Sequence, residues 1–273
     1  MKKTIKHICY AILIVFGGFL ILGVSVSFLF SEKIEDAVIQ NLTNQAENKI
    51  EVQKVEFKIF ENFPYSSVSI SNLYIKESEK FEGDTLLYAK KADVKFSIVK
   101  FLLKQITIDN ISIIDGKVSL KIDANNNKNY NVLAKSDKKN KALELNKIEL
   151  INTNFEFESS KIQSKISLNC SKINITVKNK KSLNLQINGK AYSKEITVYE
   201  KNYIENKKLE LNLNYSLIDR KSILKSSVLQ IENLDFLLDG SFDSKNIIKL
   251  DFEGNKHSIS SLMQHTPNHL KGI

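Results

Sequence analysis

Few side chains in this sequence have the types and the spacing that chemistry at a site requires. Its histidines are His7, His257, His265 and His269, and the last two are four residues apart. Two histidines at that spacing on a helix could hold a metal ion, but Pro267 between them interrupts a regular helix. We read them as polar residues of the C-terminal tail and predict no metal site.

The sequence also lacks the motifs that position a nucleophile, a phosphate or a redox pair. It contains no glycine-rich phosphate loop, no Gly-x-Ser-x-Gly turn and no Cys-x-x-Cys pair. Its cysteines are Cys9, which lies within an apolar stretch near the N-terminus, and Cys170, so no disulfide is expected. The expectation is a protein that is not an enzyme, with no catalytic residue and no cofactor.

The net charge of +9 comes almost entirely from lysine, because Arg220 is the only arginine. Proteins that clamp phosphates or read bases favour arginine together with aromatic stacking surfaces. The lysines here are scattered singly along polar faces, which is typical of a solvated surface and also suits a position near anionic lipid headgroups. The sequence therefore predicts no nucleic-acid partner.

The element that must place the rest of the chain is an uncharged run of 23 residues, Ile8–Phe30. As a helix it would span about 35 Å, enough to cross a hydrocarbon core of about 30 Å. Lysines gather on its N-terminal side, so the positive-inside rule predicts a cytoplasmic N-terminus and a body across the membrane. A cleaved signal peptide ending near Val24–Ser27 is the alternative. We favour an anchor within residues 1–30, because the apolar run continues past that point.

Residues 31–50 predict a short amphipathic helix beside the membrane. Ser31 is a good N-cap, and Glu32 and Glu35 complement the helix dipole in the first turn. The apolar residues recur at three- and four-residue spacing and form a narrow stripe. Such a stripe could cover one end of a β core or lie on the membrane face. We favour packing on the core, because the polar side of the helix is not strongly basic.

From residue 51 to residue 273 the apolar period changes from 3.6 to 2. Val94 and Phe96 alternate with Lys95 and Ser97, and the same alternation returns in about a dozen segments. Strands of this kind are apolar on one face and polar on the other. The fold class expected is mainly β, with the two N-terminal helices followed by a long, curved, mostly antiparallel β-sheet.

One local motif predicts the curvature of that sheet. Residues 70–75, 108–113 and 231–236 share the form Ile-x-Asn-apolar-x-apolar. In each segment the alternation slips by one residue at the asparagine, as it does at a β-bulge, which bends and twists a strand. Asparagine suits such a site because it tolerates left-handed backbone geometry.

The order of the motifs in residues 1–135 resembles the N-terminal region of AsmA-like proteins. An anchor and a short helix come first, and beyond residue 135 only the general β pattern is similar. The segments that carry the resemblance are, in order, 63–75 with Phe63-Pro64, the alternating strand 87–98, 101–111 with a leucine pair, 116–123, and Asn129-Tyr130-Asn131-Val132.

This resemblance implies a member of the AsmA/TamB group, the bacterial branch of bridge-like lipid transfer proteins. The group has a long, taco-shaped β-sheet with an apolar inner groove, is anchored in the inner membrane and reaches into the periplasm. It is connected with phospholipid transport and outer-membrane biogenesis, which implies membrane lipids and outer-membrane or envelope proteins as partners. Relatives are usually much longer, so residues 51–273 are expected to form an AsmA-like domain that is short or truncated at its C-terminus.

The physical chemistry of a lipid tail supports that expectation independently. An acyl chain exposed to water costs about 0.8 kcal/mol per CH₂, or about 13 kcal/mol for 16 carbons. One-faced strands lying side by side would supply a continuous apolar track for phospholipid acyl chains. The same strands could instead pair face to face into a β-sandwich, a membrane-tethered scaffold or interaction module without a ligand. The residues predicted to line the groove are Val55, Phe57, Ile59, Val94, Phe96, Ile98, Ile106, Ile108, Val118, Leu120 and Ile122.

Overall fold

The computed structural model describes residues 50–62, 65–81, 84–97, 107–130, 144–179, 183–219, 221–242 and 248–254. The predicted membrane span and nearly all of the predicted juxtamembrane helix lie outside these residues. Ile50, the last residue of that predicted helix, begins a strand instead. Within the described ranges, no helix has both the length and the apolar character needed to cross a membrane.

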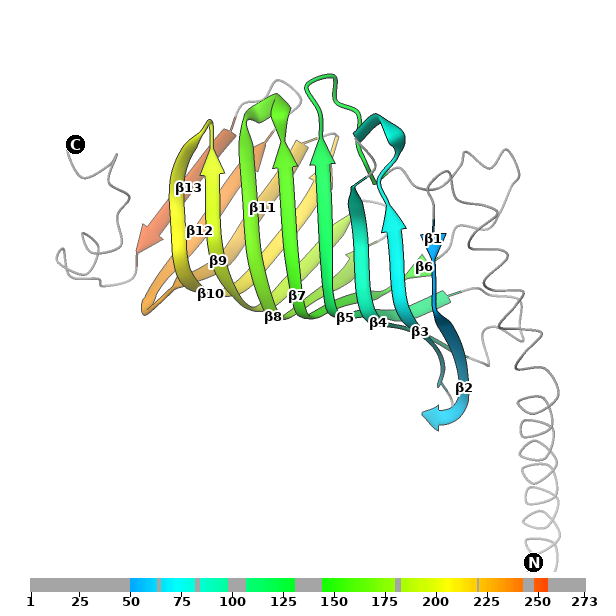
Figure 1. Cartoon of the computed structure of the whole chain (residues 1–273). Coiled ribbons are helices and arrows are strands. Elements are labelled where there is room, and N and C mark those ends of the chain that lie inside the picture. The colour runs from blue at the N-terminus through cyan, green and yellow to red at the C-terminus, as the bar shows by residue number, and fades with distance from the viewer. Residues whose placement is uncertain are drawn as a thin grey trace, which may run out of the picture.

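The described chain is built almost entirely from strands of one sheet, which confirms the mainly β fold (Figure 1). Short 3-10 turns, η1 (Glu79–Phe81) and η2 (Ser160–Ile162), join some of the strands. The strands are β1 (Ile50–Glu51), β2 (Lys54–Asn62), β3 (Tyr65–Lys76), β4 (Thr85–Ser97), β5 (Thr107–Ile122), β6 (Glu144–Leu145), β7 (Lys147–Ser159), β8 (Ser164–Asn179), β9 (Asn184–Val198), β10 (Lys201–Ile218), β11 (Lys221–Ile231), β12 (Leu234–Phe242) and β13 (Ile248–Gly254).

Neighbouring strands pair antiparallel except around β5, so the prediction of a mostly antiparallel sheet is confirmed. The exception is the pairing of β5 with β6 and β7, which is parallel and aligns Ile111 with Ile148. Parallel neighbours need a crossover connection, because the chain must return to the starting end of the sheet. Residues 123–146 make that connection, so the antiparallel order of the sheet is interrupted between β5 and β7.

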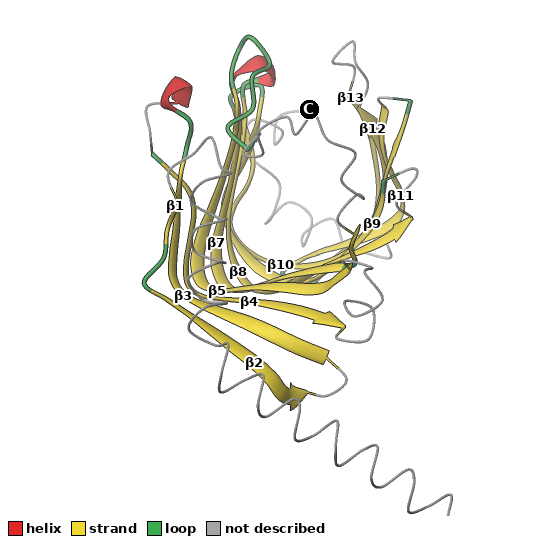
Figure 2. Cartoon of the chain, turned by 90° about the vertical axis from the view of Figure 1, so that its right-hand side faces the viewer, coloured by secondary structure: helices red, strands yellow, loops and turns green. Residues whose placement is uncertain are grey.

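The sheet bends into a U in cross-section, with β3, β5 and β7 in one wall and β11–β13 in the other (Figure 2). Every described strand belongs to this one sheet, and its hydrogen-bonded order runs from β1 and β2 at one edge to β13 at the other. The described strands therefore do not form the two separate sheets of a β-sandwich. They form an open, curved sheet.

The bend of the first strands follows a line of exposed residues that crosses β3 to β8, which we call the bend line. Along it, residues three apart face the same side of the sheet, such as Ile70 and Leu73 in β3, both buried. Asn72 between them has a φ of 48°, in the left-handed region. Asp115 and Asn152 have φ values of 52° and 47°. The bend line consists of Asn72, Lys90, Asp115, Asn152 and Ser171.

The structure confirms the predicted slip of the alternation in two of the three segments, one as a bend that keeps the register and one as a bulge, and it corrects the third. The ladder skips Asn72 and, opposite it, Lys90, so both strands carry an extra residue at the same level. At 108–111 the register does shift, and the extra residue opposite Lys95 and Phe96 is Asp109 rather than the predicted Asn110. The prediction for 231–236 is wrong, because Ile231 pairs with Leu234 and the two residues between them form a hairpin turn.

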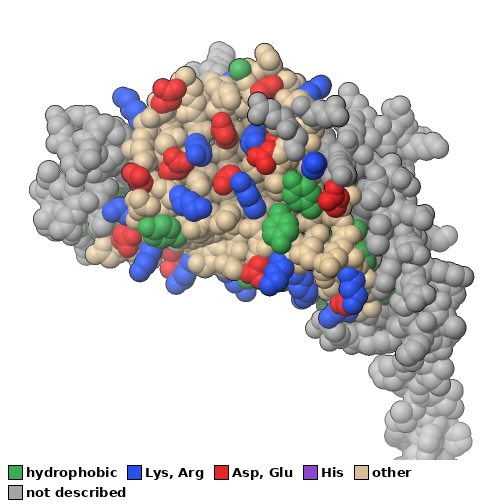
Figure 3. Space-filling view, viewed as in Figure 1, with side chains coloured by type: hydrophobic (Ala, Val, Ile, Leu, Met, Phe, Trp, Pro, Cys, Tyr) green, Lys and Arg blue, Asp and Glu red, His purple; other side chains and the backbone are tan. Residues whose placement is uncertain are grey.

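The two faces of the sheet differ in polarity as the alternation predicts. Lysine, aspartate and glutamate side chains are scattered over the outer face of the wall turned to the viewer, with few apolar side chains among them (Figure 3). The apolar residues lie on the other side, where buried side chains such as Val55, Leu150 and Ile173 form the main core cluster. Leu209, Leu229 and Leu238 form a second cluster farther along the sheet.

Candidate functional site

The candidate site is the concave apolar face of the sheet, where side chains line up from strand to strand. Directly paired residues of neighbouring strands place their side chains on the same face. Such pairs connect without interruption across ten strands, and at about 4.8 Å per strand the row is about 43 Å long. This central row consists of Val55, Ile70, Ala92, Ile113, Leu150, Ile173, Gly189, Leu211, Leu229 and Phe236.

Two further rows run beside the central row on the same face. Both are apolar apart from one threonine, so the three rows together make a broad apolar floor. The first side row consists of Phe57, Val68, Val94, Ile111, Ile148, Ile175, Ile187 and, at its end, Leu213. The second consists of Leu73, Ala89, Gly116, Thr153, Cys170, Ala191, Leu209, Ile231 and Leu234.

The structure brings most of the predicted groove residues onto this face. Val55 is buried in the main cluster, and the rings of Phe57 and Phe96 are in contact, with their centroids 5.9 Å apart. Val94 pairs with Val68 of the first side row. The remaining described candidates are half-buried residues of β5 that pair with concave-face neighbours. At the start of β5, Ile108 pairs with Phe96. Toward its other end, Val118 pairs with Leu87 and Phe155, Leu120 with Phe157, and Ile122 with Ser159.

For three of the predicted groove residues the structure describes no side-chain position. Ile98 and Ile106 lie outside the described residues. Ile59 lies within β2, but its side chain is not described.

Sequence reasoning missed that the apolar floor continues through β7 to β12. Its candidates ended at residue 122, whereas Leu168, Ile187 and Leu211 pack against the main cluster and Leu229 lies in the second. The alternation in these later strands was visible. The alternation does not predict which strands are neighbours in the sheet. The order of the strands decides whether the apolar faces of separate strands join into one floor.

Small residues at the inside of the bend were also missed as part of the site. Ala89 and Ala191 are buried there, and a Cβ on Gly116 would overlap the backbone oxygen of Tyr88. Gly189 has a φ of 147°, and a Cβ there would overlap the carbonyl oxygen of Lys172. A glycine inside a strand pattern is the sequence signal for such a close approach of two backbones.

Cys170 lies in the second side row and behaves as a small apolar residue. Its side chain is buried and forms no disulfide. Burial raises the pKa of its thiol to about 11, because the charged thiolate loses its hydration. The thiolate is the reactive form, so this cysteine is suited to packing rather than to nucleophilic chemistry.

On the outer face, Glu149 is the centre of a compact polar cluster. Its Oε1 accepts a hydrogen bond from Lys147 Nζ at 2.8 Å, while Oε2 accepts from Asn110 at 2.6 Å and from Ser112 at 2.9 Å. Burial alone would raise the pKa of Glu149, but these hydrogen bonds outweigh it and lower the pKa to about 2. A carboxylate held this firmly in its charged form is suited to fixing β5 against β7, not to exchanging protons near neutral pH.

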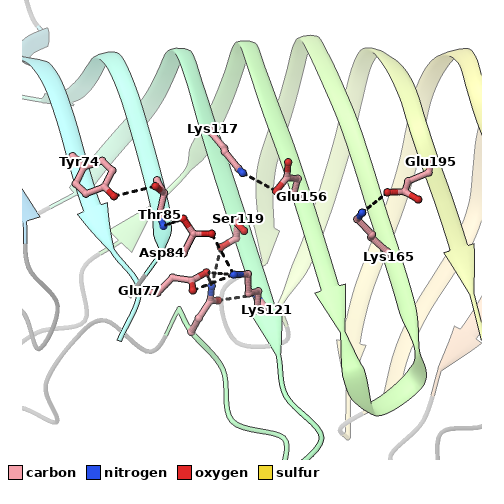
Figure 4. A network of polar contacts seen from close by, with 11 residues as sticks. Tyr74, Glu77, Asp84, Thr85, Lys117, Ser119, Lys121, Glu156, Lys165 and Glu195 are labelled. Carbon is pink, nitrogen blue, oxygen red and sulfur yellow. Dashed lines mark hydrogen bonds and ion pairs between the residues drawn. The ribbon is translucent and has the colours of Figure 1, made fainter. Parts of the chain in front are cut away.

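A second polar cluster joins the end of β5 to the β3–β4 connection (Figure 4). The Glu77 side chain is fully buried, and Lys121 Nζ lies 3.1 Å from its Oε1. Asn129, also buried, donates to Glu77 at 2.8 Å and accepts from the backbone N–H of Lys121 at 2.8 Å. Burial would lower the pKa of Lys121, but the hydrogen bond and charge of Glu77 outweigh it and raise that pKa. The cluster fixes the start of the crossover against β5. It does so beyond Val118, the last residue of β5 that pairs with β4.

The geometry therefore contains one extended apolar face and polar clusters whose charged members are engaged with one another. The chain matches no family model, and no curated protein matches it.

Proposed function

We propose that the concave face shelters lipid acyl chains, and that the chain is a membrane-anchored, AsmA-like protein of phospholipid transport. The observation that carries this proposal is the central row, which continues without a polar break across ten strands. An acyl chain crossing water needs apolar contact along its whole path, since each exposed CH₂ costs about 0.8 kcal/mol.

The curvature of the sheet supports the same proposal. A flat one-faced sheet would expose its apolar side, and large exposed apolar patches mark interaction sites or aggregation. Bending at residues such as Asn72 and Asp115 turns that side inward while the lysine- and acid-rich face stays outside. The result suits an apolar ligand that lies along the trough.

The anchor and the location are proposed from the sequence. Ile8–Phe30 would hold the chain in the bacterial inner membrane with its body in the periplasm, where membrane lipids are its partners and outer-membrane or envelope proteins could receive them. The proposal assigns no catalytic residue, cofactor or nucleic-acid partner.

Site-specific photo-crosslinking in the full-length chain tests this function. A p-benzoyl-phenylalanine residue replaces Ile187, which faces the concave side, and a matched variant carries it at Asn188, the next residue, which faces outward. Cells are labelled with ³²P-phosphate, irradiated, and the purified protein is examined for a labelled phospholipid adduct. An adduct at position 187 and none at 188 is expected.

The matched positions keep the anchor, the expression level and the membrane exposure of the chain the same. Equal labelling at both positions would mean that membrane lipids merely surround the protein. An absence of adduct at 187 and, in a second variant, at Leu211 would exclude the acyl-chain function and leave the tethered scaffold.

A further inference from the structure

The two ends of the strands form two rims of the trough that differ in chemistry. One rim carries η1, η2 and the β5 end, and Figure 2 shows both 3-10 turns at the top of the left wall. The opposite rim is formed by the β8–β9 and β10–β11 connections, together with the starts of β5 and β7. The hydrogen bond from Val177 N to Asn146 O and that from Asn146 N to Ile108 O hold these strand ends together. We call this second edge the basic rim and define it by Tyr65, Lys178, Leu183, Leu217, Ile218 and Lys221.

Exposed aliphatic side chains gather on the basic rim. Leu183, Leu217 and Ile218 are 41%, 37% and 47% exposed. The backbone N–H of Leu217 donates to the carbonyl of Leu183 at 3.0 Å, so these two strand ends are adjacent, and Ile218 follows Leu217 directly at the same rim. Among the large aliphatic side chains that the structure describes as exposed, the remaining one is Leu237, on the outer face of β12. Scattered exposed leucines are ordinary, but a cluster at an edge marks a contact surface.

Basic residues flank this patch. Lys178 and Lys221 are exposed at the two connections. Asp219 is the acid that the structure describes at these two connections. The opposite rim carries charges of both signs, because the acids Asp84, Asp123, Glu200 and Glu232 lie there together with the exposed lysines Lys80, Lys128, Lys161 and Lys201. Lys178 and Lys221 thus flank the exposed aliphatic side chains of the basic rim, whereas charges of both signs are mixed along the opposite rim.

We propose that the basic rim docks on an anionic lipid surface. Aliphatic side chains that enter the headgroup region, flanked by lysines that pair with anionic lipids, are the combination by which proteins lie on membranes. An acidic protein would be attracted by the lysines alone, whereas the aliphatic cluster between them suits an apolar layer beneath a charged surface. A chain tethered to the same membrane also meets that surface at a high effective concentration, so a small patch is enough. This contact goes beyond the proposed function, because it does not depend on what the concave face holds.

The sequence contains no tryptophan, so a single introduced tryptophan reports on its own surroundings. Ile218→Trp places it on the basic rim, and Leu237→Trp is the matched control, because the two native residues are 47% and 48% exposed on the same sheet. The full-length variants are reconstituted into vesicles of equal parts phosphatidylcholine and phosphatidylglycerol with brominated acyl chains. Circular dichroism checks that both variants keep the β-sheet.

For Ile218→Trp we expect a shift of the emission to shorter wavelength and a loss of intensity by bromine quenching. Leu237→Trp should show neither change. The quenching should disappear in vesicles of brominated phosphatidylcholine alone and in about 1 M NaCl, where the Debye length is about 3 Å. Exchanging Lys178 and Lys221 for glutamate in the Ile218→Trp chain should abolish it as well.

Equal emission from the two tryptophans in anionic vesicles would overturn the proposal, and so would quenching that is the same in neutral vesicles. If Ile218→Trp does not fold, Leu183→Trp on the neighbouring turn makes the same measurement. An acidic protein as the true partner would appear as absent quenching in every vesicle. The outcome is separate from that of the crosslinking at Ile187, which reports on the concave face even if the basic rim stays in water.

Discussion

Ile70 and Leu73 are three residues apart in β3, yet both side chains are buried on the concave face, because Asn72 between them adopts a φ of 48°. A regular strand would place them on opposite faces, since its side chains alternate. The extra residue at Asn72 absorbs the difference and turns the strand. Asp115 in β5 and Asn152 in β7 adopt the same left-handed geometry. Together these residues bend a sheet that would otherwise expose its apolar side.

Replacing Asn72 by valine should therefore destabilise the protein, whereas Asn72→Gly should not. A β-branched residue in the left-handed region costs about 1–2 kcal/mol or more, while glycine adopts it freely. Both substitutions remove the hydrogen bond that the asparagine donates to Gln53, so the difference isolates the backbone effect. Urea unfolding followed by circular dichroism measures it, and equal unfolding free energies would contradict the role of the bend.

Gly189→Ala should be among the most damaging single-methyl additions in the sheet. Its φ of 147° is unfavourable for alanine, and the new Cβ would overlap the carbonyl oxygen of Lys172 in the neighbouring strand. We expect a loss of about 1–3 kcal/mol or more in the free energy of unfolding. The control is Ser171→Ala at an exposed site nearby, expected to change stability by less than about 0.5 kcal/mol. A Gly189→Ala protein as stable as its control would refute the close approach.

Lowering the pH should weaken the contact between β5 and β7, because the carboxylate of Glu149 becomes protonated. The pKa of this carboxyl falls from 4.5 to about 2 on folding, so its contribution is present above pH 4.5 and is lost as the pH falls toward 2. The linkage amounts to at most about 3.5 kcal/mol, because one pKa unit corresponds to about 1.4 kcal/mol. In Glu149→Gln the fall of stability between these pH values should be smaller, whereas Glu210→Gln, at an exposed ion pair, should leave the profile unchanged.

The pair Glu77 and Lys121 should couple far more strongly than a surface ion pair. Lys121→Met would leave the carboxylate of Glu77, which has no exposed surface, without its cation. Breaking a buried pair costs about 3–5 kcal/mol, against about 0–1 kcal/mol for exposed pairs such as Lys190 and Glu210. Double-mutant cycles with Glu77→Gln and with Glu210→Gln compare the two pairs. Similar coupling energies would contradict the assigned role of the buried cluster.

Under the proposed function, Phe96→Asp should reduce lipid loading more than it reduces stability. Phe96 lies at the end of the concave floor and is half-buried, so water can still reach a carboxylate there. Ile108→Asp, its partner across the ladder, should behave alike. The readouts are the labelled adduct at Ile187 and the unfolding midpoint, with Lys95→Asp as an outward-facing control. Full lipid loading in a folded Phe96→Asp protein would count against the groove.

Alternation along the chain was sufficient to predict one-faced strands, because the period of a strand is a local property. The same holds for the bend at Asn72, where the slip in the pattern and the preference of asparagine for left-handed geometry agree. At Asn233 the same pattern misled, since two residues between apolar positions fit a hairpin turn as well as a bulge. Local spacing does not distinguish a strand that bends from one that ends.

The parallel pairing of β5 and β7 could not be predicted from alternation either, because it depends on a crossover of 123–146. The same limit hid the polar cluster, in which Glu77 and Asn129 are 52 residues apart in sequence. Contacts of that kind depend on which strand ends are neighbours. The pattern of a single segment carries no information about that.

Each described strand makes most of its contacts with the strands that are hydrogen-bonded beside it in the sheet. The stability of such an array is close to a sum of nearest-neighbour terms, as in a solenoid. Lengthening the trough by one hairpin would therefore leave the existing interfaces untouched, and length becomes a quantity that selection can adjust without redesigning a core.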